Sequence, residues 1–362
     1  MAVAQVDRQH GKGGGVGGVG CHRGIGRGAE VDLAVGGPES FAAFPDLAPV
    51  KCRRTTGVKV GPYRREGLLQ VAQVLGLGNQ QVYEFLYGEH PSYDRFCEWI
   101  VETAGPPDPA LLSRYHGWLM ECAPNKAARQ QLAAIAAMEP VLDAEAMAFW
   151  DAQGYVVVPD AIAPEEVSAL REHVWETVGA SPDDRASWYR AKTNGIMVPD
   201  FQHPTIEAAR RSPRIHKAFA QLWGTENLWV TIDRMGFNPP ETDEWPFAGS
   251  GIHWDVSLAQ PIPFGTQGVL YLTDTAADQG AFRCVPGFHR RIDAWLDGLG
   301  DADPRKVDLS DEQHMVAGKA GDLIIWRQDL PHAASPNRSD RPRLVQYLNY
   351  YSPDMPIRSR WR

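Results

Sequence analysis

The sequence predicts a mostly β fold with flanking helices, of the sandwich or jelly-roll kind. Beyond about residue 225, short apolar runs alternate with Gly and Pro, and they cover 228–232, 268–273, 323–326 and 344–350. These runs are rich in β-branched and aromatic residues, which favour strands. Many short strands separated by turn residues are typical of proteins built from two packed sheets.

The first 60 residues differ from the rest of the chain. The stretch from Gly11 to Gly28 is dense in Gly and contains almost no large apolar side chain. Such a segment cannot bury enough surface to offset the conformational entropy lost on folding. We therefore predict that residues 1–60 are disordered.

Between residues 61 and 140 the apolar side chains recur at helical spacing, as in Leu68, Val71 and Leu75. Gly and Pro interrupt the pattern, which divides it into several short helices. We interpret residues 61–140 as an accessory helical module and residues 141–362 as the jelly-roll domain.

Local signals mark the start of that domain. A short helix ends at Phe149-Trp150 with Gly154 as its C-cap, and Tyr155–Val158 is a β-branched strand. Pro164 then opens a second helix at its first turn, where a missing N–H does no harm.

Composition and charge argue against several classes of protein. Hydrophobic residues make up 43% and charged residues 22%, and the formal net charge is -9. That charge does not attract nucleic-acid phosphates, and no apolar run is long enough to span a membrane. The N-terminus lacks a signal-peptide pattern. The five Cys residues are scattered without C-x-x-C spacing, so we expect reduced thiols in a cytoplasmic protein.

A metal site is indicated by His253-Trp254-Asp255, an H-x-D pair. On extended chain, residues two apart point to the same face, so this spacing supplies two converging ligands. Imidazole nitrogen with carboxylate oxygen suits a metal such as iron(II). The pair alone is weak evidence, since it arises by chance in many proteins.

The third ligand must come from elsewhere in the chain. His332 follows the predicted strand 323–326, and in a jelly roll a late strand can lie beside an early one. Arg343 stands on the next predicted strand, where its guanidinium could form a bidentate pair with a carboxylate.

Together these motifs resemble the phytanoyl-CoA dioxygenase family. The likeness covers about residues 143–352, and its motifs occur in the family's order. They are the H-x-D pair, Asp278-Gln279-Gly280-Ala281, Val285-Pro286-Gly287-Phe288-His289-Arg290, Gly321-Asp322-Leu323, His332 and the stretch from Asn337 to Arg343.

The resemblance implies a double-stranded β-helix in which His253, Asp255 and His332 hold Fe(II). Arg343 matches the arginine that holds the far carboxylate of 2-oxoglutarate, and Asn238 is a further candidate contact for this cosubstrate. The family often has a hydroxyl residue two positions after the distal His. Here that residue is Ala334, and the neighbouring Ser335 could compensate.

The implied function is an Fe(II)- and 2-oxoglutarate-dependent dioxygenase that uses O2 to hydroxylate an unactivated carbon of a small molecule, releasing succinate and CO2. Related halogenases have Gly or Ala in place of Asp255, so the carboxylate favours hydroxylation. Two alternatives stay open: a jelly-roll metal-dependent oxygenase that does not use 2-oxoglutarate, and a non-catalytic binding module on the same fold. No nucleic acid or membrane is expected as a partner.

Overall fold

The computed structural model describes residues 71–356, so the disorder predicted for residues 1–60 lies outside these residues. Within this range the chain forms two compact units. One comprises residues 71–75 and 79–128, and the other comprises 76–78 and 129–356. We describe each by itself.

The first unit is helical, and its elements lie where the apolar spacing predicted helices. It contains α4 (Asn79–Glu89), α5 (Tyr93–Ala104) and α6 (Pro109–Leu119), and α7 (Lys126–Ala136) contains the boundary between the units. Side-chain caps begin two of them: Ser92 accepts from the Arg95 amide, and Asp108 accepts from the Ala110 amide. The Phe85 and Trp99 rings stack with centroids 4.2 Å apart and join α4 to α5.

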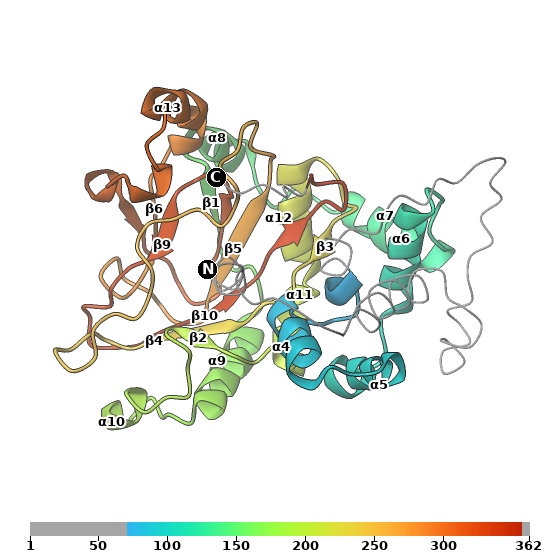
Figure 1. The fold of residues 1–362 in the computed structure, drawn as a ribbon, viewed down its shortest axis with the longest axis horizontal. Helices are drawn as coiled ribbons and strands as arrows, with labels where there is room; N and C mark the ends of the chain where they lie inside the picture. Colours follow the sequence, from blue (N-terminus) through green and yellow to red (C-terminus); the bar gives the residue numbers. More distant parts are fainter. Residues whose placement is uncertain (1–70, 357–362) are drawn as a thin grey trace, which may run out of the picture. The chain divides into compact units, whose positions relative to one another are not determined.

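The second unit is built around a six-stranded antiparallel sheet in the order β1-β8-β5-β10-β4-β2 (Figure 1). The strands in this order are Tyr155–Val158, Leu323–Arg327, Thr266–Tyr271, Arg343–Tyr347, Met235–Asn238 and Met197–Val198. Neighbours in the sheet are therefore far apart in sequence, as a jelly roll requires.

A second sheet has the order β7-β6-β9, with strands His314–Val316, Phe282–Cys284 and His332–Ala334. His253 extends it by an isolated antiparallel bridge to His332. A separate pair joins β3 (Trp229–Val230) to β11 (Tyr350–Tyr351). Two antiparallel sheets with this connectivity form the double-stranded β-helix expected from the resemblance.

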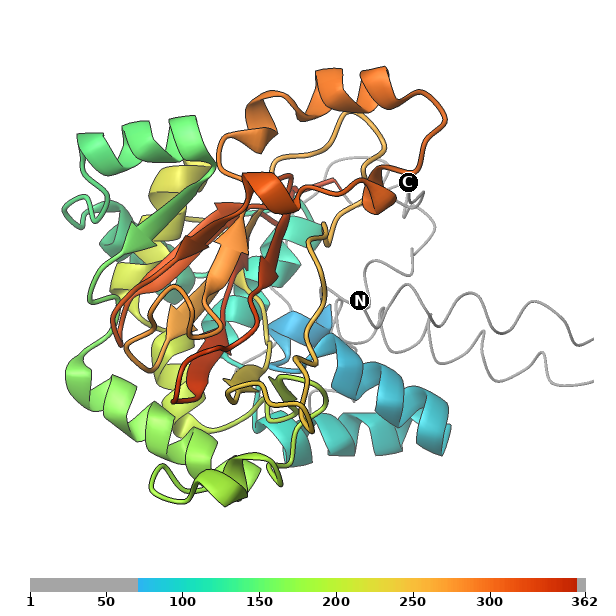
Figure 2. The same cartoon turned by 90° about the vertical axis from the view of Figure 1, so that its left-hand side faces the viewer.

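Strand alternation divides the apolar core into two layers. In β8, Leu323 and Ile325 face the helices, whereas Ile324 and Trp326 pack between the two sheets. Figure 2 shows the green and yellow helices along one side of the main sheet. Among the helices that contribute buried residues to this outer layer are α9 (Pro164–Val178), α11 (Pro204–Arg210) and α12 (Pro213–Trp223). The inner layer, between the sheets, is where the functional side chains lie.

The helix cap, strand and helix start predicted between residues 149 and 164 are confirmed. Helix α8 (Ala144–Gln153) ends at Gly154, whose φ of 78° is left-handed and whose amide donates to the Trp150 carbonyl. Strand β1 has the predicted bounds, and α9 begins at Pro164. The remaining short elements are α10 (Arg185–Trp188), α13 (Ile292–Leu299) and the 3-10 turns Phe288–Arg290, Pro304–Lys306 and Ser310–Glu312.

Two expectations need correction. In residue number, helices exceed strands over the described range, so β structure dominates only after about residue 225. The strand predicted at 344–350 is two strands, because the chain leaves β5 after Tyr347 and pairs with β3 from Tyr350.

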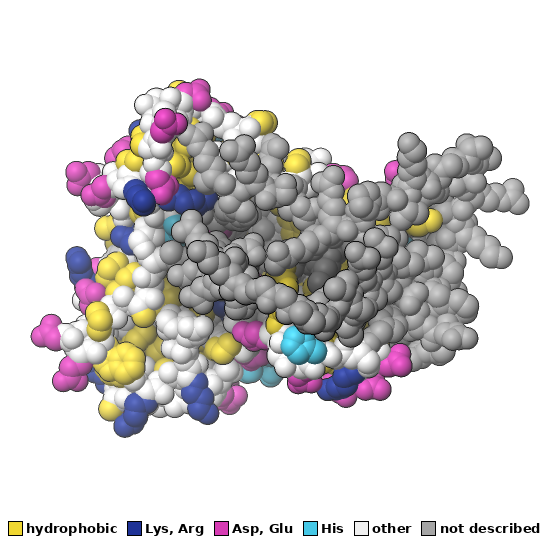
Figure 3. Space-filling view, in the orientation of Figure 1, with side chains coloured by type: hydrophobic (Ala, Val, Ile, Leu, Met, Phe, Trp, Pro, Cys, Tyr) yellow, Lys and Arg dark blue, Asp and Glu magenta, His cyan; other side chains and the backbone are white. Residues whose placement is uncertain are grey.

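On the face shown in Figure 3, acidic and basic side chains are interspersed without a large patch of one sign. None of the helices in the described range is both long and apolar enough to cross a bilayer.

Candidate metal centre

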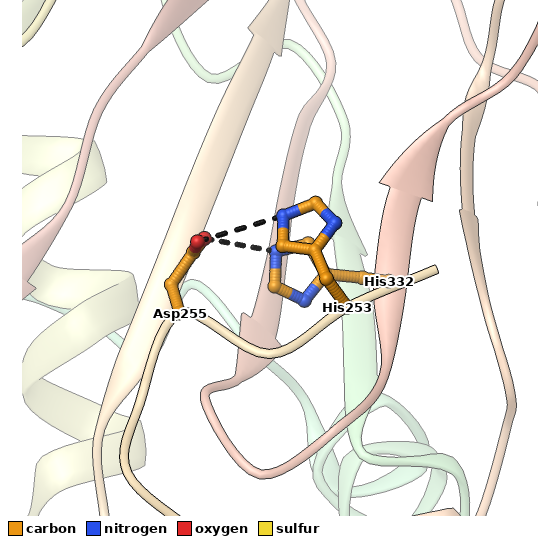
Figure 4. Close-up of side chains that lie close together, drawn as sticks. All are labelled: His253, Asp255 and His332. Atoms are coloured by element: carbon orange, nitrogen blue, oxygen red, sulfur yellow. Dashed lines mark ion pairs between the residues drawn. The ribbon is translucent and has the colours of Figure 1, made fainter. Parts of the chain in front are cut away.

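Three side chains converge between the sheets, from the H-x-D segment and from β9 (Figure 4). His253 Nε2 lies 3.5 Å from Asp255 Oδ1, and His332 Nε2 lies 3.3 Å from Asp255 Oδ2. One ligand atom from each residue lies within 4.8 Å of the other two. Across residues 71–356 no other group of His, Cys, Asp and Glu converges in this way.

The backbone explains why these residues meet. His253 and His332 exchange two backbone hydrogen bonds, each 3.0 Å long, which sets their imidazoles side by side with ring centroids 4.9 Å apart. Asp255 follows His253 by two positions and so returns to the same face. The sheet pairing thus supplies the long-range contact, and the local spacing supplies the carboxylate.

Each imidazole is oriented by a backbone carbonyl. His253 Nδ1 lies 2.8 Å from the Gly251 oxygen, and His332 Nδ1 lies 3.0 Å from the Leu330 oxygen. Because a carbonyl oxygen can only accept, each Nδ1 donates its proton. In the neutral rings Nε2 then carries the lone pair, and both lone pairs are directed at the site.

Two successive hydrogen bonds from the main sheet hold the Asp255 carboxylate. The Gln267 amide donates to Asp255 Oδ2 at 2.8 Å, and the Trp326 indole donates to Gln267 Oε1 at 3.1 Å. Gln267 and Trp326 are cross-strand partners on β5 and β8. Sequence reasoning missed Gln267, because its two contacts depend on residues 12 and 59 positions away.

Electrostatics prepare the three groups for a cation. Desolvation raises the pKa of the Asp255 carboxyl, but the hydrogen bond and charge of His332, the charge of His253 and the Gln267 amide together hold that pKa well below its usual range. Burial is the main cause that lowers the pKa of His253, and the charge of His332 lowers it further. An ionised carboxylate beside a neutral imidazole is the protonation state that binds metal.

The donor set fits Fe(II). Two imidazole nitrogens and one carboxylate oxygen on one side of an ion leave its other positions open, which is the facial triad of non-haem Fe(II) oxygenases. The open side matters chemically, because a cosubstrate and O2 need coordination positions that a closed structural site does not provide.

Arg343 and Asn238 also face the space between the sheets. They are cross-strand partners on β10 and β4, and alternation puts Arg343 on the same face as Val345, which belongs to the inner core layer. Only 1% of Arg343 is exposed. Among the described residues, neither its Nε nor its Nη2 has a hydrogen-bond partner.

A buried guanidinium in this state strongly favours an anion. The side-chain amide of Asn238 beside it donates to the Ser335 carbonyl at 3.2 Å. Gly280 leaves the room that Asn238 needs, since a Cβ at residue 280 would lie 2.3 Å from Asn238 Nδ2. The D-Q-G segment found in the sequence therefore leaves space for the Asn238 side chain.

Ser335 does not replace the missing hydroxyl at Ala334. Its Oγ donates to the Ala281 carbonyl at 2.9 Å, so the proton of the hydroxyl is already engaged. Ala334 shares the face of His332 but carries no polar group.

Comparison with known proteins identifies the family. Residues 150–345 match the sequence profile described as phytanoyl-CoA dioxygenase (PhyH), which is more than half of the chain. The chain belongs to the phytanoyl-CoA dioxygenase family.

The chain is similar to methylphosphonate hydroxylase of Gimesia maris, with 23% identity over 209 residues, 56% of this chain and 77% of that protein. It is similar to ectoine dioxygenase of Nocardia farcinica, with 23% identity over 239 residues, 58% of this chain and 77% of that protein. A solved structure, EvdO2 of Micromonospora carbonacea var. aurantiaca complexed with 2-oxoglutarate, has 19% identity and a TM-score of 0.43, covering 62% of this chain and 97% of that one.

Membership of the phytanoyl-CoA dioxygenase family confirms the class of enzyme expected from the motifs. The protein is an Fe(II)- and 2-oxoglutarate-dependent oxygenase with the facial triad His253, Asp255 and His332. The cosubstrate roles expected of Arg343 and Asn238 stay predictions.

Proposed function

We propose that the enzyme hydroxylates an unactivated carbon of a small-molecule substrate and converts 2-oxoglutarate to succinate and CO2. The observation that carries this proposal is the buried Arg343 guanidinium, which within residues 71–356 has no hydrogen-bond partner at Nε or Nη2 and faces the same interior as the triad. The names of the two relatives above, which refer to methylphosphonate and ectoine, support a small-molecule substrate.

His253, Asp255 and His332 hold the iron in this proposal. When bound, Fe(II) would provide open coordination positions for the cosubstrate and O2 and would mediate electron transfer to O2, for which 2-oxoglutarate and the substrate are the reductants. The protein keeps the two Nε2 lone pairs and the carboxylate directed at one point through the Gly251 and Leu330 carbonyls and the Gln267 amide. None of the ligands then has to reorient on metal binding.

Arg343 binds the carboxylate of 2-oxoglutarate that is remote from the iron. A guanidinium presents two parallel N–H donors to a carboxylate, which fixes the orientation of a flexible diacid better than an ammonium does. Asn238, next to Arg343 in the sheet register, contributes a polar wall to the same pocket. Its backbone oxygen accepts from the buried Asn337 amide at 2.8 Å, which holds this part of β4 in place.

Asp255 selects hydroxylation over halogenation. A carboxylate in this position occupies a coordination site, whereas Gly or Ala would leave that site to a halide ion. The Gln267 bond to Oδ2 leaves Oδ1 free to face the imidazole of His253. The carboxylate can then bind a metal through one oxygen while the other stays hydrogen-bonded to the protein.

An anaerobic titration tests the proposal. Adding 2-oxoglutarate to the Fe(II)-loaded protein should produce a visible charge-transfer band, and admitting O2 with substrates from a small-molecule library should yield succinate. Asp255→Ala should lose substrate hydroxylation and the succinate formation that is coupled to it. Oxygen consumption without 2-oxoglutarate would favour the cosubstrate-independent oxygenase. Ligand binding without any oxygen consumption would favour the binding module.

A further inference from the structure

On the side away from β9, the H-x-D segment has no neighbouring strand among residues 71–356. In an antiparallel ladder, successive residues direct their backbone groups to opposite sides. His253 faces β9 and exchanges its hydrogen bonds with His332, so the groups of Trp254 face away from β9. Beyond the bridge at His253 the segment belongs to no strand. Its outward carbonyls need partners that the sheet does not supply.

Arg305 supplies those partners. Its Nη1 donates to the Trp254 carbonyl and its Nη2 donates to the Val256 carbonyl, both at 2.7 Å. One guanidinium therefore bridges the carbonyls on either side of Asp255. It takes the place of a neighbouring strand at the position where the segment carries a metal ligand.

The Trp254 side chain provides a second anchor for the backbone from Trp254 to Val256. This residue is 3% exposed, and its indole donates to the Asp329 carbonyl at 3.1 Å. Its ring lies 5.8 Å from Phe288 and 5.8 Å from Trp295, centroid to centroid. The backbone around Asp255 is thus held by Arg305, Phe288 and Trp295 from the segment between β6 and β7, and by the indole bond to Asp329 in the turn between β8 and β9.

Asp255 itself has little packing to hold it. Its side chain is 37% exposed, and its carboxylate makes polar contacts to the two His residues and Gln267. The position of its carboxylate therefore follows the position of its backbone. An error of about 1 Å at a ligand is enough to impair a site of this kind.

We propose that Arg305 is a positioning residue that fixes Asp255 for metal binding by bridging the Trp254 and Val256 carbonyls. This inference rests on the proposed role of Asp255 as a ligand.

The charge of Arg305 and its positioning role predict opposite effects on metal affinity when Arg305 is replaced. Arg305 and Asp255 interact favourably, and a nearby positive charge by itself weakens the binding of a second cation. If charge were all that mattered, a neutral residue at position 305 would tighten metal binding. If positioning dominates, the same change weakens it, and Lys, which keeps the charge but not the planar two-nitrogen fork, weakens it as well.

The experiment measures the dissociation constants of Co(II), by its visible spectrum, and of Fe(II) under anaerobic conditions. The variants are Arg305→Gln, Arg305→Lys and Asp255→Ala, and the control is Lys306→Ala, whose side chain is 84% exposed. Thermal unfolding of each metal-free variant is recorded alongside. We expect both Arg305 variants to bind metal about tenfold more weakly. Their metal-free unfolding should stay close to that of the wild type, and Lys306→Ala should match the wild type in both measurements.

Several results would overturn the proposal. Tighter metal binding by Arg305→Gln, or wild-type binding by Arg305→Lys, would assign the residue a purely electrostatic effect. Recovery of both variants only as unfolded protein would make Arg305 a folding residue. Failure of the function proposal is distinguishable, because Asp255→Ala would then bind Co(II) as tightly as the wild type does.

Discussion

Replacing Arg343 with Met should weaken 2-oxoglutarate binding while leaving the cosubstrate-free protein at least as stable as the wild type. Arg343 is 1% exposed, and two of its three guanidinium nitrogens have no hydrogen-bond partner among the described residues. A buried charge without a partner destabilises a folded protein by several kcal/mol, and Met fills similar space without charge. The free energy of unfolding should therefore stay constant or rise.

The effect on binding has the opposite sign. Truncating one member of a buried, hydrogen-bonded charge pair weakens an interaction by about 2–5 kcal/mol. At about 1.4 kcal/mol per factor of ten, the dissociation constant of 2-oxoglutarate should increase roughly 30-fold to several thousand-fold. Arg343→Lys should fall between wild type and Met, because it restores the charge without the bidentate geometry.

Arg210 offers a matched control. It is also 1% exposed, but its guanidinium donates to the Phe201 and Asp233 carbonyls and to Glu207. Arg210→Met leaves those buried acceptors unsatisfied, so it should lower the unfolding free energy by about 3–5 kcal/mol without changing cosubstrate affinity in the folded fraction.

The assay combines anaerobic 2-oxoglutarate titration of the Fe(II) protein with denaturant unfolding of the metal-free protein. An Arg343→Met variant that binds 2-oxoglutarate like the wild type would refute the assigned role. A large loss of stability in that variant would show instead that the guanidinium is paired within the protein.

Three further predictions concern Asp255, Tyr271 and Cys284. Metal at about 100 times its dissociation constant should raise the unfolding free energy by about 2.7 kcal/mol in the wild type and not in Asp255→Ala at the same concentration, as measured by denaturant unfolding. Burial raises the pKa of Tyr271 to about 12 from an ordinary value of 10, so the contribution of this phenol to stability should be complete below pH 10 and decline by about 2–3 kcal/mol up to pH 12. Tyr271→Phe should flatten this slope in unfolding measurements across pH, and an unchanged slope would contradict the assignment. Burial also raises the pKa of the Cys284 thiol, so native-state alkylation followed by peptide mass spectrometry should label it far more slowly than Cys97. Equal labelling would contradict that expectation.

Local signals account for the parts of the fold that sequence reasoning predicted well. The left-handed cap at Gly154, the β-branched run of β1 and the Pro that opens α9 each act through their own backbone. The H-x-D spacing belongs to the same class, because the two-residue period of extended chain is enough to bring His253 and Asp255 to one face.

Non-local pairing explains what was missed. Strands of two or three residues, such as β2 and β6, carry almost no pattern of their own, and their partners define them. In the sequence, Gln267 is one polar residue in an apolar strand. Its role becomes evident only from its pairing with Trp326 of β8. His332 was proposed because a late strand of a jelly roll can lie beside an early one, and the family's motif order supported it, since no local rule connects it to His253.

The metal centre lies where the hydrogen bonding of the sheet stops. This arrangement follows from the need to hold an ion and a cosubstrate. A continuous ladder would fill the interior with paired strands and leave no room for an ion and a diacid. Where pairing ends, each buried carbonyl still requires a donor. Side chains provide them: Arg305 serves Trp254 and Val256, and Asn337, which is fully buried, donates to Asn238 and to Arg341 at 2.8 Å each. Substitutions at such residues should therefore displace the ligands before they unfold the core, because they support the backbone of the site and contribute little apolar burial.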